Sequence, residues 1–339
     1  MILSVRKNIT IIANLLDTEF LIKLSKKNLV LPFYHAVSDN DLIHLKHLYP
    51  VISVNRFKKD LDFLQQKYKP ISHINLFDQI FCKTNKKENV FFLTFDDGLR
   101  QFHDVVAPIL IERGIPATCF INSAFIDNKD MFFRLKASVL IEKAQKMQLT
   151  RSQYSFIRKL FEQHNLIFHH PVDLLRISDN NKELLDKIAP VIGVDFREYL
   201  AVNKPYLSKE QIANLIKQGF SIGAHSVSHP YFPDLDEDAQ IEQLRQCIHF
   251  IQREFGINDR LFSFPYTDFG IKKTFFSSIK EDVDFTFGTA NLKTDEIQTN
   301  LQRIPMEIFN SKSAGEIIKT AYLLYILKMV FNKHVIFRD

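Results

Sequence analysis

Short apolar runs alternate with amphipathic segments along most of this chain of 339 residues. The runs have the length and composition of buried strands, and the segments between them have helical periodicity, several of them ending at a glycine. Strands that alternate with helices favour parallel pairing, because a parallel connection needs a crossover long enough to hold a helix. The sequence therefore predicts an α/β fold, a distorted or incomplete (β/α)7 barrel. The runs are LVLPFYH (29–35), VFFLTF (90–95), ATCFIN (117–122), FSIGAH (220–225), LFSFPY (261–266), FTFGT (285–289) and LQRIPME (301–307).

One long segment, from about 130 to 205, interrupts this alternation. It is rich in Leu, Lys, Gln and Asn and lies where a loop of a few residues would normally join two units, so we expect a helical insertion. Two interpretations stay open: a cover over one flank of the barrel, or a substrate-selecting lid over the barrel mouth. We expect residues 29–310 to form the barrel with its insertion, 1–28 an N-terminal helical extension and 311–339 a C-terminal helix.

Composition narrows the class of protein. The apolar content of 46% is enough for a large core. The formal charge of +5 comes from 44 basic and 39 acidic residues scattered along the chain, without a dense basic run, so we expect no nucleic-acid partner. Cys82, Cys119 and Cys247 show no CxxC spacing and cannot all pair, which indicates free thiols in a reducing compartment.

The terminal segments bear on location. The first 27 residues lack a continuous apolar core followed by a small-residue cleavage site, and no run reaches 18 uninterrupted apolar residues. We therefore expect a cytoplasmic protein. Residues 317–331 are apolar on most sides but contain Lys319 and Lys328. They form either a helix packed on the core or a helix that contacts the inner membrane face peripherally.

Polar residues follow the ends of the apolar runs. In a parallel α/β barrel the active site lies at the carboxyl ends of the strands, so these residues should meet. His225 and His229 of HSVSH can lie on one side of a helical or turn-like step. Two imidazoles and one carboxylate, with one position open, form the ligand set of a catalytic zinc, and a second carboxylate is then free to act as a base. The residues at the run ends are Tyr34 and His35, Asp96 and Asp97, His225 and His229, Pro265 and Tyr266, and Arg303 to Glu307.

Several motifs together resemble a known family. TFDDG (94–98), GIPATCFIN (114–122) and QGFSIGAHSVSHP (218–230) are similar to segments of the polysaccharide deacetylases, carbohydrate esterase family 4, which includes the chitooligosaccharide deacetylases. The resemblance extends roughly from Leu29 to Glu307. It implies the following roles: Asp96 as general base, Asp97, His225 and His229 as metal ligands, and Tyr266 of FSFPY as the oxyanion donor.

The chain departs from the family pattern at two places. Many members have an arginine just before the Pro-Tyr pair that orients the base, whereas position 263 is serine here, and we expect Arg303 to replace it. Many also take the acid for the leaving amine from a late histidine near a tryptophan, but this chain has no tryptophan. His35 is the remaining candidate for the acid. Its alternative role is to stabilise the end of the first strand through a hydrogen bond.

These observations predict a metal-dependent hydrolase, with Zn²⁺ as the expected divalent metal. It would remove an N-acetyl or other N-acyl group from an amino sugar of a polysaccharide or of its biosynthetic intermediate, so the expected partner is an N-acetylated saccharide. The alternatives are a catalytically inactive, carbohydrate-binding member of the same fold and an interaction module built on the insertion. An uncommitted base beside a complete ligand set argues against the inactive alternative, since a structural metal site needs no base.

Overall fold

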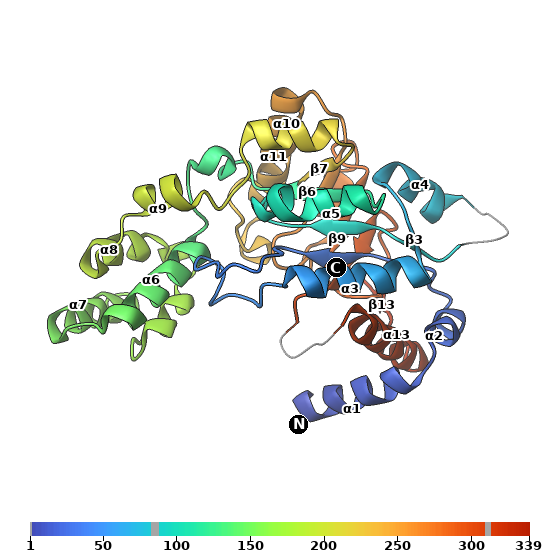
Figure 1. Ribbon diagram of the computed structural model, residues 1–339, viewed down its shortest axis with the longest axis horizontal. Helices are drawn as coiled ribbons and strands as arrows, with labels where there is room; N and C mark the ends of the chain where they lie inside the picture. The colour runs from blue at the N-terminus through green and yellow to red at the C-terminus, as the bar shows by residue number, and fades with distance from the viewer. Residues whose placement is uncertain (1, 83–87, 309–312) are drawn as a thin grey trace.

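The computed structural model describes residues 2–82, 88–308 and 313–339 (Figure 1). Its main feature is a parallel sheet of eight strands in the order β11-β9-β8-β7-β6-β5-β2-β12. Each predicted apolar run contributes to this sheet, as expected of strands that are buried on both faces. The strands are β2 (Pro32–Tyr34), β5 (Leu93–Phe95), β6 (Ala117–Ile121), β7 (Ser221–Ala224), β8 (Leu261–Ser263), β9 (Phe285–Gly288), β11 (Asn300–Gln302) and β12 (Ile304–Pro305).

A single chain segment closes the sheet into a barrel. Strands β11 and β12 are separated only by Arg303, yet β11 pairs with β9 at one end of the strand order and β12 pairs with β2 at the other. The registers place Asn300 opposite Thr286 and Ile304 opposite Pro32. The predicted (β/α)7 barrel is therefore confirmed, with the seventh strand broken in two at the point where the ring closes.

Two predicted strands are longer than their barrel portions. The runs 29–35 and 90–95 also contain β1 (Leu29–Val30) and β4 (Val90–Phe91), which form a small parallel sheet with β3 (Lys69–Pro70). Leu29 pairs with Val90, and Phe33 pairs with Thr94 at the same offset, so the two runs stay in one register throughout.

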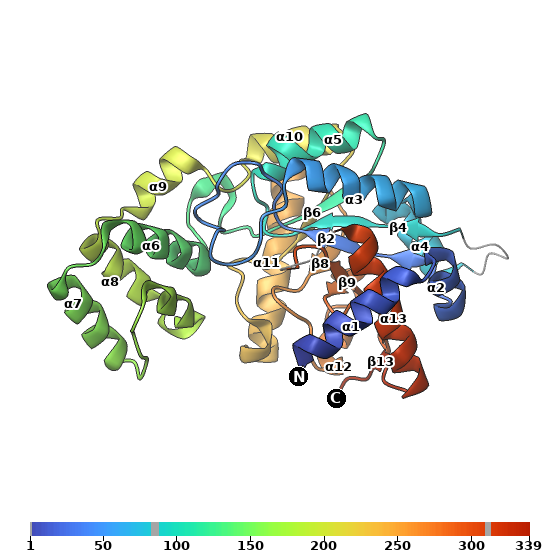
Figure 2. The ribbon, with the colours of Figure 1, turned by 60° about the horizontal axis from the view of Figure 1, so that its bottom comes forward.

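Helices connect the strands and cover the outside of the barrel (Figures 1 and 2). Most of their apolar faces join the strand residues in one large core, as amphipathic helices of a βα fold do, and Leu76 of the helix at 73–81 packs with strand residues in a smaller cluster. These helices are α3 (Val54–Lys67), α4 (His73–Phe81), α5 (Ala107–Glu112), α10 (Lys209–Lys217), α11 (Glu237–Phe255) and α12 (Lys273–Ser278).

The insertion between β6 and β7 is helical, as predicted. Among the described residues 130–205 the structure has helices and no strand, and a separate hydrophobic cluster packs them together. Figure 1 shows these helices in green and yellow-green on one side of the barrel. The domain limits themselves stay predictions, and the limit between 310 and 311 lies outside the described residues. The helices are α6 (Phe133–Met147), α7 (Arg151–Glu162), α8 (Glu183–Ile192) and α9 (Phe196–Asn203).

The C-terminal segment is built differently from the expected single helix. After α13 (Ala314–Val330) the chain forms β13 (Val335–Ile336), which pairs with β10 (Thr294–Asp295). Helix α13 itself packs against the N-terminal helices α1 (Ile2–Leu15) and α2 (Thr18–Ser25) (Figure 2).

The packing of α13 gives no support to a membrane contact. The Ala314 N–H donates to Asp60 Oδ1 at 2.7 Å, and the hydroxyl of Tyr322 donates to the Lys27 carbonyl at 2.9 Å. Tyr322 and Tyr325 are buried in the core, although Phe331 is 68% exposed. Residues 317–331 contain three aromatic side chains, and two of them are thus not available to a membrane surface. In the described part of the chain, no helix combines the length and apolar character that crossing a bilayer requires.

Candidate active site

A cavity of about 600 Å³ opens at the carboxyl ends of the barrel strands. Residues that follow β2, β5, β7 and β8 reach it, which is the end of a parallel barrel where active sites lie. The structure thus brings the predicted residues together, with Arg303 buried beneath the others. The predicted residues that line the cavity are His35, Asp96, Asp97, His225, His229 and Tyr266.

Asp97, His225 and His229 form a group that could hold a metal ion. Their ligand atoms all lie within 4.8 Å of one another, and Asp97 Oδ1 is 3.4 Å from His225 Nε2 and 3.2 Å from His229 Nε2. His225 Nδ1 donates to the Ser263 carbonyl at 2.8 Å, which leaves Nε2 with its lone pair directed at the group.

The chemistry of this group fits a divalent cation. All three residues are buried, and Asp97 Oδ1 has no hydrogen-bond partner among the described residues. A buried carboxylate oxygen without a hydrogen bond is costly, and a cation held between this oxygen and two imidazole nitrogens would remove that cost. Two histidines and one carboxylate are also a known ligand set of catalytic zinc, in which the remaining position stays open.

Backbone conformations around the cavity are unusual. Asp97 (φ 72°), Ser226 (φ 71°), His229 (φ 59°) and Tyr266 (φ 59°) all have left-handed backbones. Non-glycine residues rarely adopt this region, and such strain concentrates at functional sites. Gly98 is left-handed too, and a Cβ there would lie 3.1 Å from Ile121 Cγ2, which accounts for the glycine of TFDDG.

Arg303 donates a hydrogen bond from each terminal nitrogen to Asp96. Nη1 donates to Asp96 Oδ1 at 2.8 Å and Nη2 donates to Oδ2 at 2.7 Å, a bidentate pair. Burial raises the pKa of Asp96, but the charges of Arg303, His225 and His35 lower it further, so the pKa lies below its ordinary value. Asp96 is therefore held ionised although it is buried.

The surroundings of Arg303 show how the chain accommodates it. Its side chain is fully buried, with the guanidinium 4.3 Å above the ring of Phe33 and 5.5 Å from that of Phe120. Nη2 also donates to Ser263 Oγ at 2.6 Å, and Ser263 Oγ donates to Asp96 Oδ2 at 3.3 Å. The small side chain of Ser263, at the position where the family resemblance would place an arginine, leaves room for a guanidinium that enters from the last strand.

His35 has a carboxylate partner that the sequence reading did not identify. Its Nδ1 contacts Glu307 Oε2, while Glu307 Oε1 accepts from the backbone N–H groups of His35 at 2.9 Å and Ala36 at 3.0 Å. Burial lowers the pKa of His35, but Glu307 raises it more, to about 9. His35 ends the first apolar run and Glu307 ends the last one. Their shared position at strand ends was the one sequence feature that could have indicated that they meet.

The insertion supplies part of the cavity wall. Phe132, Arg134, Leu135 and Leu175 line it, and the Phe132 ring lies 4.4 Å from the ring of His229. These contacts favour the interpretation in which the insertion shapes the site over the one in which it only covers the barrel. Nothing in the local sequence pattern distinguishes these four residues from the rest of the insertion.

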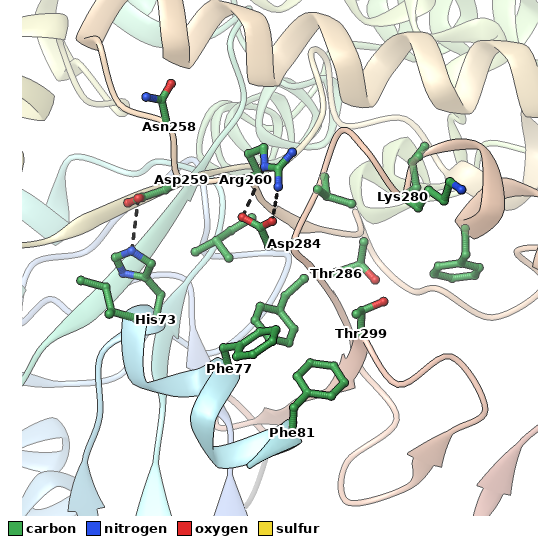
Figure 3. Close-up of a pocket in the computed structure, with 16 residues that line it drawn as sticks. His73, Phe77, Phe81, Asn258, Asp259, Arg260, Lys280, Asp284, Thr286 and Thr299 are labelled. Carbon is green, nitrogen blue, oxygen red and sulfur yellow. Dashed lines mark hydrogen bonds and ion pairs between the residues drawn. The ribbon is translucent and has the colours of Figure 1, made fainter.

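A second cavity, of about 470 Å³, lies at the opposite end of the barrel, where β8 and β9 begin (Figure 3). Its charged side chains largely satisfy each other: His73 pairs with Asp259 at 3.2 Å, and Arg260 pairs with Asp284 (Figure 3). In the part of the chain that the structure describes, Asp97, His225 and His229 are the one group with metal-ligand geometry. The candidate active site is therefore the cavity at the carboxyl ends of the barrel strands.

Comparison with known proteins bears on the family and on the fold. The family model described as polysaccharide deacetylase matches residues 83–281. The deacetylase PplD of Streptococcus pyogenes, solved in complex with acetate, has a TM-score of 0.56 at 13% identity, with 86% of this chain and 97% of that chain covered. For IcaB from Ammonifex degensii the TM-score is 0.54 at 16% identity, with coverage of 87% and 97%. A search of curated proteins gave no match.

At these identities the two solved structures are evidence for the fold alone, whereas the family model covers more than half of the chain. The matched region includes TFDDG, HSVSH and the strands that carry them. The chain belongs to the polysaccharide deacetylase family and is an amide hydrolase of the deacetylase type.

Proposed function

We propose that this protein removes an acetyl or other acyl group from the nitrogen of an amino sugar, in a polysaccharide or in an intermediate of its synthesis, with a divalent metal as cofactor. The observation that carries this proposal is the pairing of two different carboxylates at one strand end: Asp97 within a metal-binding group and Asp96 held ionised beside it. Zn²⁺ is the expected metal because the ligands are two imidazoles and one carboxylate. When bound, it supplies Lewis-acid activation of water and of the amide carbonyl.

The residues of the chain would divide the remaining work. Asp96 accepts the proton of the attacking water, since it is ionised and lies at the cavity. The backbone N–H of Tyr266 would donate to the oxyanion that develops on the carbonyl oxygen. His35 would donate a proton to the leaving amine, for which the Glu307 carboxylate keeps it charged.

The test is acetate release from a panel of N-acetylated saccharides by the purified, metal-loaded protein, with the metal-free protein as control. We expect release from at least one saccharide and none without metal. Saccharide binding without release would favour the catalytically inactive alternative. The contact between Arg303 and Asp96 argues against that alternative, because it supplies the base with an arginine although position 263 is serine. A cytoplasmic location stays a prediction.

Arg303→Ala should move the acid limb of the pH profile of kcat/KM to higher pH. Without the guanidinium, burial raises the pKa of Asp96, and a base must be deprotonated to act, so activity is lost at a higher pH as the solution is acidified. We expect about a tenfold loss of kcat/KM near neutral pH, less than for loss of the base. Arg113→Ala, at an arginine paired with Asp62 outside the cavity, is the control. An acid limb that does not move leaves Arg303 only a structural role.

Glu307→Gln should move the basic limb of the same profile to lower pH. An acid must be protonated to act, and the pKa of His35 would fall from about 9 toward its ordinary value of 6.5 without the carboxylate charge. Glutamine keeps the shape and one acceptor oxygen for the backbone of His35 and Ala36. The NMR titration of the His35 ring would report the pKa directly. If the ring pKa falls while the basic limb stays in place, His35 is not the acid.

A further inference from the structure

Arg134 brings an unpaired positive charge to the wall of the cavity. It lies in the first turn of α6, within the insertion, and is half-buried. Most arginines of the described chain pair with a carboxylate; Arg158 with Glu162 and Arg176 with Asp173 are examples within the insertion itself. No carboxylate of a described residue lies within ion-pair distance of Arg134. A half-buried guanidinium that lines a cavity and has no counter-charge is suited to bind an anion that enters the cavity.

Other contacts hold this guanidinium in place without using its terminal nitrogens. Its Nε donates to the Tyr266 hydroxyl at 2.9 Å, and its Cζ lies 5.5 Å from the centre of the Tyr266 ring and 5.6 Å from that of Phe133. No described residue accepts a hydrogen bond from Nη1 or Nη2. The two nitrogens form a preorganised fork whose geometry suits the two oxygens of a carboxylate or a phosphate.

The position of Arg134 relative to the metal-binding group indicates which part of a substrate it would meet. The Tyr266 ring lies 4.8 Å from the ring of His229, so the guanidinium is separated from the metal-binding group by one aromatic side chain. An acyl group at that metal-binding group would therefore not reach Arg134, but a substituent of the same sugar or of its neighbour would. The remaining imidazole of the outer wall, His47, is already paired with Glu142 at 3.1 Å.

We infer that Arg134 binds an anionic group of the substrate, a carboxylate or a phosphate, close to the N-acylated sugar. This inference rests on the proposed function, because it assigns a charge to the saccharide that the same cavity receives. Because Arg134 belongs to the insertion, the insertion would select acidic N-acylated saccharides over neutral ones.

Binding of three probes to the zinc-loaded Asp96→Asn protein tests this inference, since that variant should bind without turnover. The probes are N-acetylglucosamine, N-acetylglucosamine 1-phosphate and N-acetylmuramic acid, measured by calorimetry. We expect at least one anionic probe to bind about tenfold more tightly than the neutral one, the scale of one charge-assisted hydrogen-bonded pair. The phosphate and carboxylate probes show which anion is preferred.

Arg134→Gln, added to the same protein, should weaken the anionic probe much more than N-acetylglucosamine and so remove the difference between them, while Arg134→Lys should restore part of it. Arg158→Gln, at a paired arginine of the insertion outside the cavity, should keep the full difference. The inference is overturned if neither anionic probe binds more tightly than the neutral one. It is also overturned if Arg134→Gln weakens all three probes equally, because the arginine would then only support Tyr266.

Acetate release by the wild-type protein separates this inference from the proposed function. Anion preference that depends on Arg134, without acetate release from any saccharide, contradicts the hydrolase and leaves the anion site. Acetate release without such preference contradicts the anion site and leaves the hydrolase.

Discussion

Asp96→Asn should lower kcat by about 10² or more while the protein keeps its metal. Asparagine has nearly the same shape as aspartate but cannot accept the proton of the attacking water, and losses of this size follow the removal of a general base. The metal should stay because its ligands are Asp97, His225 and His229, not Asp96. The measurements are steady-state kinetics and elemental analysis of the same preparation.

The substitution also removes the charge that faces Arg303, which is completely buried. Some loss of stability is therefore expected, and retained metal shows that the strands carrying the site are still folded. Asp259→Asn is a matched control, since Asp259 pairs with His73 at the opposite end of the barrel. Loss of metal together with activity would mean that Asp96 and Asp97 have exchanged roles, and activity within tenfold of the wild type would exclude Asp96 as the base.

His225→Ala should abolish stoichiometric metal binding. Its Nε2 is one of three ligand atoms, and its orientation depends on the bond from Nδ1 to the Ser263 carbonyl. Alanine leaves Asp97 and His229 alone, and two ligands rarely hold a catalytic zinc against competition. Elemental analysis after dialysis against a weak chelator gives the metal content, and acetate release should fall to background.

His249→Ala provides the control for this result, because His249 is an exposed histidine of α11 that is not part of the cavity lining. It should keep metal and activity. If the His225→Ala protein still holds one metal ion per chain, the Asp97, His225 and His229 group is not the metal site.

The sequence was informative where local patterns decide structure. Barrel strands buried on both faces read as continuous apolar runs, and their carboxyl ends mark one edge, so the neighbourhood of Asp96, His225 and Tyr266 could be predicted from their position after each run. The helical insertion could also be predicted, since the stretch lacks any run of that type.

Local sequence patterns could not predict which residues far apart in the chain come into contact. His35 and Glu307 meet although 272 residues separate them, and periodicity carries no information on partners so distant. Arg134 differs from the insertion's other basic residues only in the tertiary packing that places it on the cavity wall. Helix α13 is apolar on most sides. This pattern indicates burial but does not tell whether protein or lipid covers the helix, and the observed contacts with α1, α2 and α3 are tertiary information.

The segment that closes the barrel, Asn300–Pro305, is the last of the barrel strands to leave the ribosome. By then β5 and β7 can have formed, and Asp96, Asp97 and His225 directly follow these strands. Arg303, which neutralises Asp96, has not yet been placed. Pairing of β12 with β2 joins the last barrel strand to the first, the kind of distant contact that forms slowly in folding. Because Arg303 sits between β11 and β12, the same late step that completes the ring also delivers the counter-charge of Asp96. A chain in which β11 and β12 have not yet paired would thus hold the metal-binding residues without the counter-charge that keeps Asp96 ionised, and it would be a weaker hydrolase than the closed barrel.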